Sequence, residues 1–394
     1  MWNEGFPLEA AFDCAKRACY SGLDSVALRR EVAERVSHAV DFDAHAFSTC
    51  DPDTGLATHT VGEGIPPGLA RTYVEILYPE DLARVSMEMP RKGISVYSMA
   101  DQSERAQAAM RSHGIWQQLH VSISDAGRLW GTWCLMRGSN SVATTGRDYL
   151  FLRRLAPHIA RGLQTAARID RGLADDLSQS SESAPGVIVL DSRNNATLRT
   201  AIAATWLEDL SDFGVGTTDD VPLSILGLAS QLRTRPDDLG FELHLRARGR
   251  SGRWYMLRAS LSEPDARGQS AVVVVVRPAM PQETAKLLTH LYALSARERE
   301  VVAAVARGEA TKSIAICLGV SPHTVNEHIQ RACDKIGVRG RKALIAKLFF
   351  DGYAPNLATP RPTIGEAGSG GREAGSGKRE EQLNTTRYRL IASR

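Results

Sequence analysis

The hydrophobic positions along the chain repeat with two different periods, and the changes of period divide it into segments. Near the N-terminus, VALRREVAERVSHAV repeats at helical spacing. Short apolar runs bounded by turn residues follow and predict three strands, in AHAFSTC, QLHVSIS and RLWGTWCLMRG. The second and third strands are predicted to form an antiparallel hairpin that turns at Asp125, Ala126 and Gly127. A helix is predicted over residues 147–170, with apolar residues near helical spacing at Leu150, Leu155, Ile159 and Leu163.

A polar, serine-rich stretch, DDLSQSSESAPG, separates this part from a second segment. There GVIVLD predicts a strand and ATLRTAIAATWLEDL predicts a helix. Three further strands are predicted in FELHLRAR, RWYMLRASL and AVVVVVRP, which are separated by GRSG and EPDARGQ. One strand, then helix, then three strands indicates a small sheet covered on one side, so both segments are predicted to be α+β.

Residues 284–353 have helical patterning throughout. Ser295 and Glu298 form an S-x-x-E capping box at the start of one helix, and Gly308 ends it. Thr311 is predicted to cap a second, short helix, whose apolar face is Ile314, Ala315 and Leu318.

A third helix follows a tight turn at Gly319, with Ser321 as its N-cap and Pro322 at its first position. Its predicted buried residues are Val325, Ile329, Ala332 and Ile336. A fourth helix carries more apolar residues than one face of a small domain needs, namely Leu344, Ile345, Leu348, Phe349 and Phe350. This surplus predicts a dimer contact on the fourth helix.

The polar face of the third helix is the candidate binding surface. At 100° per residue, the residues that point away from the predicted core are His323, Glu327, Gln330 and Asp334, with Asn326 and Arg331 on their flanks. Two helices joined by a short glycine turn, the second presenting such a strip, form the helix-turn-helix pattern. The same pattern is compatible with an ordinary helical hairpin whose polar face is solvated.

Charge and composition narrow the class of protein. The chain has 394 residues and a net charge of +3, and residues 295–352 alone contain ten Lys or Arg against six Asp or Glu. The rest of the chain therefore totals about −1, and a local positive surplus is expected where one module meets phosphate. The chain contains no apolar run of about 18 residues, so no membrane span is predicted. The acids near the N-terminus do not suit a secretion signal, and the six cysteines lack a C-x-x-C pair, so a reduced, cytoplasmic protein is expected.

No catalytic or phosphorelay motif is recognised in the sequence. EAGSGKRE is not a phosphate loop, because arginine stands at position 372, where the motif needs glycine, and at position 379, where it needs Ser or Thr. His45, Cys50 and His59 are close in sequence, but their spacing does not indicate a metal or haem site. No cofactor is assigned. The tryptophans of the first segment would either line a ligand pocket or belong to the core, and the core is the commoner role: Trp116, Trp130 and Trp133.

The stretch LSAREREVVAAVARGEATKSIAICLGVSPHTVNEHIQRACDKIGVRGRKALIAKLF resembles the C-terminal DNA-binding domain of LuxR-type transcription regulators, also called the NarL/GerE type. The matching parts occur in order: L-[ST]-x-R-E-x-E-V, A-x-G, K-x-I-A-x-x-L, [VI]-S-x-x-T-V-x-x-H-[IL] and K-[IL]-G-V-x-[SG]-R. The resemblance covers about 55 residues. It implies an all-α domain of four helices, with the third in the major groove and the fourth available for dimer contacts.

The rest of the chain is similar in layout to multidomain regulators of this family. RLWGTWCLMRG before LFLRRLAPHIARGL resembles a GAF-like domain, and APGVIVLD with RSGRWYMLRASL resembles a PAS-like domain. The expected organisation is a multidomain α+β protein: a GAF-like sensory domain over 1–175, a PAS-like domain over 184–280, the helix-turn-helix domain over 284–353 and a tail over 355–394. The tail repeats EAGSG and is rich in Gly, Ser, Pro, Arg and Glu, a composition that predicts disorder.

The resemblance also implies which side chains meet DNA. The candidate phosphate contacts are Lys312, Thr324, His328 and Lys335, and the candidate base readers are Asn326, Glu327, Gln330 and Arg331. A carboxylate can accept from the cytosine amino group, while Asn and Gln suit adenine. Many family members carry lysine at the position of Asn326, and this chain departs from them there. The alternative for Glu327 is a surface pair with Arg331 at i, i+4.

The expected function is that of a cytoplasmic transcription regulator without catalytic activity. Its expected partners are double-stranded DNA, a second copy of the chain, a small-molecule effector and RNA polymerase, with no membrane. The alternative is a protein-interaction module, such as an anti-activator that uses the helix-turn-helix as a docking surface. Salt separates the two, because binding through phosphates weakens steeply with salt. An enzyme with an appended DNA-binding domain is a third alternative.

Overall fold

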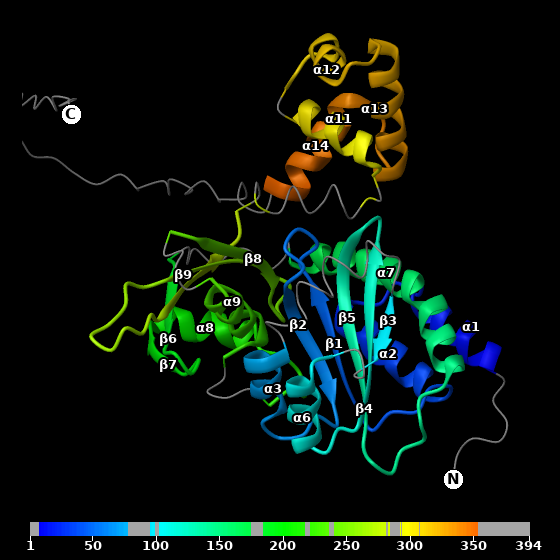
Figure 1. Ribbon diagram of the computed structural model, residues 1–394. Helices are drawn as coiled ribbons and strands as arrows, with labels where there is room; N and C mark the ends of the chain where they lie inside the picture. The colour runs from blue at the N-terminus through cyan, green and yellow to red at the C-terminus, as the bar shows by residue number, and fades with distance from the viewer. Residues whose placement is uncertain are drawn as a thin grey trace, which may run out of the picture. The chain divides into compact units, whose positions relative to one another are not determined.

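The computed structural model describes residues 8–77, 95–98, 102–174, 184–216, 221–235, 240–280 and 294–353 without 307, together with residues 283 and 292. Within them the chain forms two five-stranded antiparallel sheets and, after them, a group of four helices (Figure 1). The tail predicted over 355–394 lies outside the described residues. In the part of the chain that is described, no helix has both the length and the hydropathy that crossing a bilayer requires.

The first sheet has the strand order β2-β1-β5-β4-β3. Its strands are β1 (Ala44–Cys50), β2 (Ala57–Glu63), β3 (Val96–Ser98), β4 (Gln117–Asp125) and β5 (Arg128–Arg137). Ala126 and Gly127, at φ 49° and 73°, form the two-residue turn between β4 and β5. Two successive positive φ angles suit the twist of a tight hairpin. The hairpin predicted at this place is therefore confirmed.

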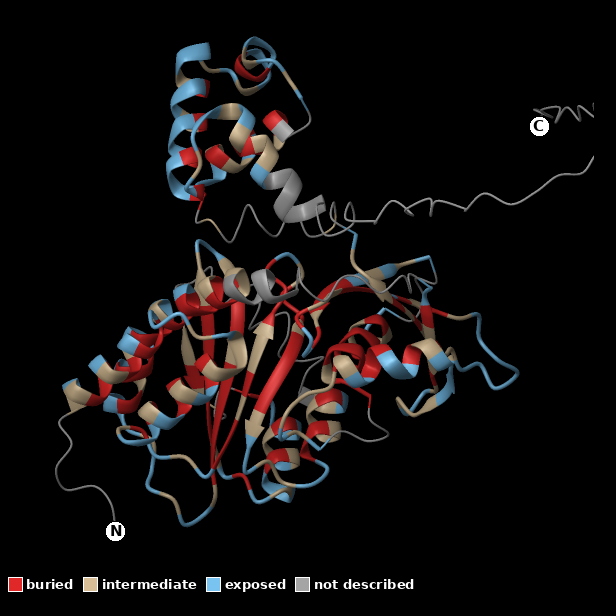
Figure 2. Ribbon diagram, turned by 180° about the vertical axis from the view of Figure 1, so that it is seen from behind, coloured by how far each residue is buried: buried red, intermediate tan, exposed pale blue. Residues whose placement is uncertain are grey.

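Helices cover both faces of the first sheet. On one face the core contains residues of α1 (Leu8–Ala18), α2 (Ser25–Ser37) and α7 (Gly146–Ala174). On the other face lie α3 (Leu69–Thr72), the π-helix η1 (Tyr73–Leu77) and α6 (Glu104–Ser112). Strand β5 alternates between the two cores, Trp133 and Leu135 facing the first, Cys134 and Met136 the second. Figure 2 shows the buried residues on these strands and on the inner helix faces.

The predicted inner face of α7 is wrong at one position. Leu155, Ile159 and Leu163 are buried as expected, but Leu150 is 61% exposed. Leu150 precedes Leu155 by five residues, which turns it about 140° away on a helix of 3.6 residues per turn. Phe151 takes the inward position instead and is 2% exposed.

The second sheet has the order β7-β6-β10-β9-β8. Its strands are β6 (Gly186–Leu190), β7 (Ala196–Arg199), β8 (Glu242–Arg248), β9 (Trp254–Leu261) and β10 (Val272–Pro278), and its helices are α8 (Ala201–Asp209) and α9 (Leu223–Arg233). Along β10, Val272, Val274 and Val276 are fully buried, and the residues between them are only partly covered. The four strands predicted here are confirmed, and the hydrophobic core joins them to both helices.

One element of the second sheet differs from the prediction. The residues ATLR, predicted as the start of a helix, form strand β7 and pair with β6. The reason is the preceding turn: Asp191 accepts backbone hydrogen bonds from Arg193 and Asn195, and Asn194 takes a positive φ of 62°. The turn brings the next residues beside β6, so the helix begins only after Thr200, whose hydroxyl caps Ala203.

The two sheets meet along strand β2. The carboxylate of Asp212 accepts from the backbone N–H of Thr60 at 2.6 Å and of Leu223 at 2.8 Å. Phe213 exchanges backbone hydrogen bonds with Thr60 and Gly62. A side chain at Gly214, where φ is 65°, would place its Cβ 1.9 Å from the carbonyl oxygen of Gly62. The contact therefore requires glycine at 214 and extends the edge of β2 with residues from the second segment.

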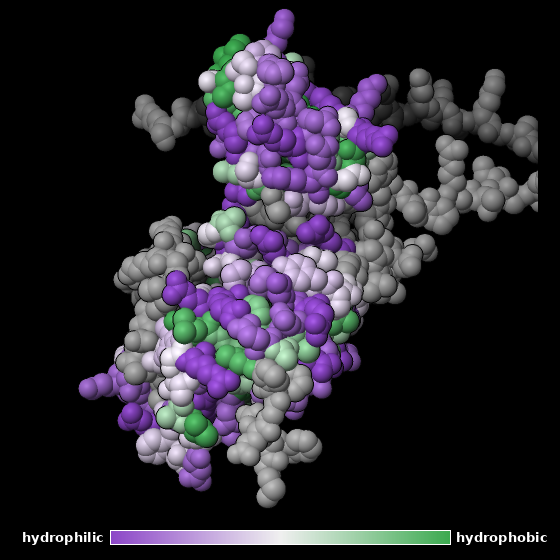
Figure 3. All heavy atoms as spheres, turned by 90° about the vertical axis from the view of Figure 1, so that its right-hand side faces the viewer, coloured by the Kyte–Doolittle hydropathy of each residue, from purple (hydrophilic) through white to green (hydrophobic). Residues whose placement is uncertain are grey.

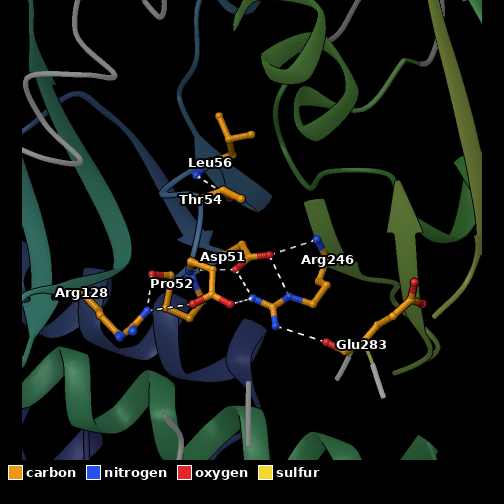
Figure 4. Close-up of polar contacts among 8 residues, drawn as sticks. Asp51, Pro52, Thr54, Leu56, Arg128, Arg246 and Glu283 are labelled. Atoms are coloured by element: carbon orange, nitrogen blue, oxygen red, sulfur yellow. Dashed lines mark hydrogen bonds and ion pairs between the residues drawn. The ribbon is translucent and has the colours of Figure 1, made fainter. Parts of the chain in front are cut away.

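A buried ion pair also joins the sheets (Figure 4). Arg246 of β8 donates to both carboxylate oxygens of Asp51, at 2.6 and 3.0 Å, and to Asp53 at 2.7 Å. Asp53 also accepts from Arg128, at 2.8 Å. The side chains of Arg246 and Asp51 are only 6% and 2% exposed. Two charges taken so far from water are tolerated because the pairing is multiple and close.

Candidate nucleic-acid interface

The C-terminal group consists of α11 (Ala296–Ala306), α12 (Thr311–Leu318), α13 (Pro322–Ile336) and α14 (Gly340–Tyr353). Its core includes Val301, Val305, Ile314 and Leu344, each fully buried. The predicted inner face of α13 is confirmed, with exposures of 0–7% at Val325, Ile329, Ala332 and Ile336. In the view of Figure 3 the surface over these helices is mostly hydrophilic.

Local signals set the helix ends as predicted. The Ser295 N–H donates to Glu298 Oε2 at 2.7 Å, and the Glu298 N–H donates to Ser295 Oγ at 3.2 Å, which completes the capping box. Ser321 Oγ accepts from the Thr324 N–H at 3.0 Å. Gly319, with φ 63°, ends α12 in the left-handed region. The turn that leads from α12 to α13 therefore begins with a backbone conformation that glycine adopts without strain.

The prediction that Thr311 caps α12 is wrong. The N-cap is Ala310, which has no side-chain capping bond, and Thr311 is the first residue of the helix. Its hydroxyl instead accepts from the guanidinium of Arg341 at 3.2 Å. Arg341 also donates to the backbone carbonyl of Glu309. An arginine from α14 therefore holds the start of α12 in place of a local cap.

Sequence reasoning missed the structural role of the arginines within the matched motif. Arg297 of α11 donates to the carbonyl of Leu318, the last residue of α12. With Arg341 at the other end, two guanidinium groups fix both ends of the short helix. Both arginines are part of the matched motif, Arg297 in its R-E pair and Arg341 in its G-R pair. Their acceptors are backbone carbonyls, which every residue has, so the sequence does not show which carbonyls they bind.

Lys335, predicted to contact phosphate, has a partner inside the domain. Its ammonium donates to Glu298 Oε2 at 2.7 Å, and the Glu298 side chain is only 5% exposed. Burial opposes ionisation of Glu298, but hydrogen bonds from Lys335 and the Ser295 N–H outweigh it and hold its pKa below the usual value. Lys335 is therefore a structural residue of the α11–α13 contact, with 40% of its side chain still exposed.

The outer face of α13 presents the four predicted base readers together. Asn326, Glu327, Gln330 and Arg331 are all exposed. Glu327 Oε1 lies 3.5 Å from His323 Nε2 and its other oxygen 3.8 Å from Arg331, contacts too long for good hydrogen bonds. Gln330 donates to Asp334 at 3.0 Å along the helix. The strip offers donors and acceptors whose internal contacts are weak enough to be exchanged for a ligand.

The remaining phosphate candidates differ in accessibility. Lys312 is exposed on α12, while Thr324 and His328 are partly buried. The Thr324 hydroxyl lies 2.9 Å from Ser321 Oγ, beside the helix N-terminus. Within the described residues, His328 Nδ1 is buried without a hydrogen-bond partner. On the outer face of α12, Ile316 is 83% exposed, a feature that the sequence reasoning did not identify.

The first sheet holds a mainly apolar cavity of about 70 Å³ on the side of α3 and α6. Leu69, Met110 and Met136 line it with a few polar groups, including Gln118 and His120.

The tryptophans do not line this cavity. Trp130 and Trp133 are in the core, the commoner role, although Trp130 also lines a smaller cavity of about 60 Å³, and Trp116 is 51% exposed. Over the part of the chain that is described, no group of three or more His, Cys, Asp or Glu residues could hold a metal.

The family model described as bacterial regulatory proteins, luxR family, matches residues 292–348, which cover α11, α12, α13 and the first part of α14. The spore germination protein GerE of Bacillus subtilis is 42% identical over 55 residues, which are 14% of this chain and 74% of GerE. This chain therefore belongs to the LuxR family of bacterial regulatory proteins.

Two longer relatives match over smaller shares of their length. The probable transcriptional regulatory protein SgaR of Hyphomicrobium methylovorum is 37% identical over 105 residues, 26% of this chain and 49% of SgaR. The probable transcriptional regulatory protein NarL of Mycobacterium tuberculosis is 48% identical over 54 residues, 14% of this chain and 25% of NarL. This chain thus spans about half of the one and a quarter of the other.

Solved structures resemble the chain only loosely. Free methionine-R-sulfoxide reductase of Neisseria meningitidis has a TM-score of 0.29 at 14% identity, covering 43% of this chain and 96% of its own. A VqmA–ligand–DNA complex of Vibrio cholerae has a TM-score of 0.24 at 16% identity, covering 46% of this chain and 88% of its own. Neither value establishes a shared fold.

Proposed function

We propose that this chain is a cytoplasmic transcription regulator that binds double-stranded DNA in a sequence-specific way and has no catalytic role. The observation that carries the proposal is the exposed polar strip of α13, set by a capped N-terminus and a glycine turn after α12. A helix held in this way can enter the major groove, which admits one α-helix and displays base edges.

In this proposal the side chains of the group divide by role. Lys312, Thr324, His328 and Lys335 contact phosphates and fix the register of the helix on the duplex. Asn326, Glu327, Gln330 and Arg331 read base edges. The Lys335 side chain is 40% exposed beside its bond to Glu298, so a phosphate can approach its ammonium.

The two sheets would then supply control. We assign the first to a GAF-like sensory domain and the second to a PAS-like domain, which gate the DNA-binding domain in a homodimer through a small molecule or a conformational signal. The support is the cavity beside the first sheet and the hydrogen-bonded junction between the sheets. RNA polymerase is a further partner expected of a regulator.

The salt dependence of DNA binding tests this function. Lys312→Ala should weaken all DNA sequences about equally and reduce the slope of log K against log salt by roughly one unit. Arg267→Ala is the matched control, because Arg267 is exposed on a turn of the second sheet and the variant also removes one positive charge. Binding that does not weaken with salt in the unmodified protein would contradict the DNA-binding proposal.

A protein-docking role is the second candidate, and one observation favours it. Ile316 is 83% exposed on α12, so a partner that docks on the helix-turn-helix would cover an apolar side chain there. If docking is the main role, Ile316→Ser should abolish partner binding and leave DNA binding unchanged in a mobility-shift assay.

A further inference from the structure

A second cavity, of about 300 Å³, lies where the two sheets meet. Its walls come from the start of α2, from β1 and β2, from the loop at Phe213 and from the turn between β8 and β9. The lining residues that matter here are Arg29, His59, Phe213, Arg248 and Arg250. The volume reaches the lower end of the range of small-molecule sites.

The cavity is lined by three arginines and one acid. The acid is Asp24, whose carboxylate already caps α2 by accepting from the N–H groups of Val26 and Ala27. Within the described residues, neither Arg29 nor Arg250 has a carboxylate within 4.0 Å. Arg246, in the same junction, contacts two carboxylates. Arg29 and Arg250 thus lack the carboxylate partners that Arg246 has.

Arg29 is the most unusual of them, because it is only 1% exposed. Four of its five N–H groups meet neutral acceptors: the carbonyls of Ser25, Phe47 and His59, and the His59 Nδ1 atom. The fifth has no acceptor among the described residues. Burial lowers the pKa of Arg29 to about 9, and the nearest acids, Asp212 and Asp24, oppose this only in part.

Asp212 is a poor counterion for Arg29. Both its oxygens accept backbone hydrogen bonds, from Thr60 and Leu223, and burial raises its pKa to about 6. Arg248 adds a third positive charge to the wall: burial lowers its pKa to about 10, Asp24 opposes the shift, and its Nε donates to the Gly252 carbonyl at 2.9 Å. A buried cation such as Arg29, with no carboxylate in contact, is costly, and an anion that enters the cavity removes this cost.

His59 adds a donor to the same cavity wall. Because arginine can only donate, the His59 Nδ1 atom must accept from Arg29, at 2.8 Å. Burial and the charge of Arg29 hold the pKa of His59 well below its usual value, so the ring is neutral and its proton is on Nε2. Within the described residues, that Nε2 atom is buried and makes no hydrogen bond of good geometry, and the backbone of Ser211 lies close enough to oppose the lowering of the pKa in part.

We propose that this cavity binds a small molecule with a carboxylate or phosphate group, which Arg29 and Arg250 pair with. Arg250 is exposed at the rim, where it stacks over Phe213 at 4.4 Å, so its guanidinium can turn toward a ligand. Arg29 comes from α2, which packs on the first sheet, and Arg250 from the turn between β8 and β9 of the second, so the bound anion strengthens the junction between the two parts. The site is separate from α13, and the proposal does not depend on DNA binding.

Anion binding to the full chain tests the proposal. Sodium phosphate and sodium succinate are titrated by calorimetry at constant ionic strength, balanced with sodium chloride. Arg250→Gln should weaken binding about ten- to a hundredfold, the effect of losing one charge-assisted hydrogen bond. Arg258→Gln is the matched control, because Arg258 is half-exposed on β9, outside the cavity, and should bind like the unmodified protein.

The anion that binds identifies the class of ligand: phosphate alone indicates a phosphate ester, succinate alone a carboxylate, and both indicate a site for either group. No saturable binding of either anion would overturn the proposal. Equal binding by Arg250→Gln and the unmodified protein would also overturn it, since the anion would then bind elsewhere, for example at the lysines of the helical group. Arg29→Met is a second variant, with the folded state checked by circular dichroism, and should abolish binding.

Discussion

At the scale of single residues, the acidic side chain at the centre of the candidate DNA-binding strip needs a physical explanation. Glu327 is 47% exposed, and its two cationic neighbours, His323 and Arg331, lie at 3.5 and 3.8 Å. Exposed pairs of this kind contribute little to stability, so the neighbours do not hold the carboxylate in place. In the proposed complex it would be available to accept from the amino group of cytosine and would repel phosphate wherever the helix is out of register.

We expect Glu327→Ala to relax the preference at one base pair of each half-site by about 1–3 kcal/mol. Non-specific binding should tighten slightly, because a negative charge near the phosphates is removed. Binding-site selection on the variant and the unmodified protein measures the change. Identical selected sequences would show that Glu327 only pairs along the helix, an interaction that contributes about 0.2–0.5 kcal/mol.

Gln330→Ala is the companion variant for the same selection. Gln330 lies three residues along the helix, about 60° away from Glu327. Its change should therefore affect a neighbouring base pair and leave the pair read by Glu327 unchanged. If neither variant alters the selected sequence, the helix must recognise DNA through Asn326 and Arg331 alone or through the shape of the duplex.

At the scale of elements, one ion pair reinforces the hydrophobic contact between α11 and α13. Glu298 closes the capping box and is nearly buried, and Lys335 reaches it from 37 residues away. Since the folded-state pKa of Glu298 lies below its unfolded value, the pair stabilises the fold above about pH 4.3. That contribution is lost as the pH falls through the folded-state pKa.

Lys335→Met should lower the stability of the helical group by about 1–3 kcal/mol, because a nearly buried carboxylate loses its charged partner. Hydrogen exchange of the α11 amides measures the change locally. Lys342→Met is the control, since Lys342 is exposed on α14. If the hydrogen exchange of the α11 amides is unchanged in Lys335→Met and the salt dependence of DNA binding is reduced, Lys335 contacts phosphate but does not stabilise the fold.

The fourth helix carries the prediction on dimerisation. Leu344 is fully buried in the domain core and Ile345 is partly buried, while the side chains of Leu348, Phe349 and Phe350 lie outside the described residues. Leu348→Glu should prevent cooperative footprinting of two half-sites that lie about one helical turn of DNA apart. If the folded variant still protects both half-sites cooperatively, the fourth helix is not the main dimer contact, and the two sheet-containing segments must provide it.

At the scale of the whole molecule, the two sheets are joined by charge as well as by backbone hydrogen bonds. Burial alone would lower the pKa of Arg246, but its bonds to Asp51 and Asp53 raise it. The pair therefore stays ionised and links β8 to the end of β1. Any signal that separates the sheets must break this contact.

We expect Arg246→Met to lower the free energy of unfolding by about 3–5 kcal/mol, because the buried carboxylate of Asp51 is left without a cation, while Asp53 keeps only its bond to Arg128. Urea unfolding measures it. Arg258→Met is the control: its ion pair with Glu242 spans 3.9 Å at the surface. That variant should change stability by less than about 1 kcal/mol. Equal effects of the two variants would show that the junction does not depend on Arg246.

The sequence by itself determined the features that arise within a few residues. The capping box of Ser295 and Glu298, the cap at Ser321 and the glycine turn at 319 each involve neighbours in the chain, so local patterns were enough. The outer face of α13 followed from helical period alone. The motif that shows the family lies in this same stretch, where residues 292–348 match.

Only the tertiary structure decided which charges are already paired. Arg246 meets Asp51 across 195 residues, and Lys335 meets Glu298 across 37. Strand β7 likewise exists because a turn brings it beside β6, although its residues alone suggested helix. Contacts between distant segments depend on how whole elements pack, and no local pattern encodes that packing. For the same reason, the arginines around the cavity became a site only when both sheets were in place.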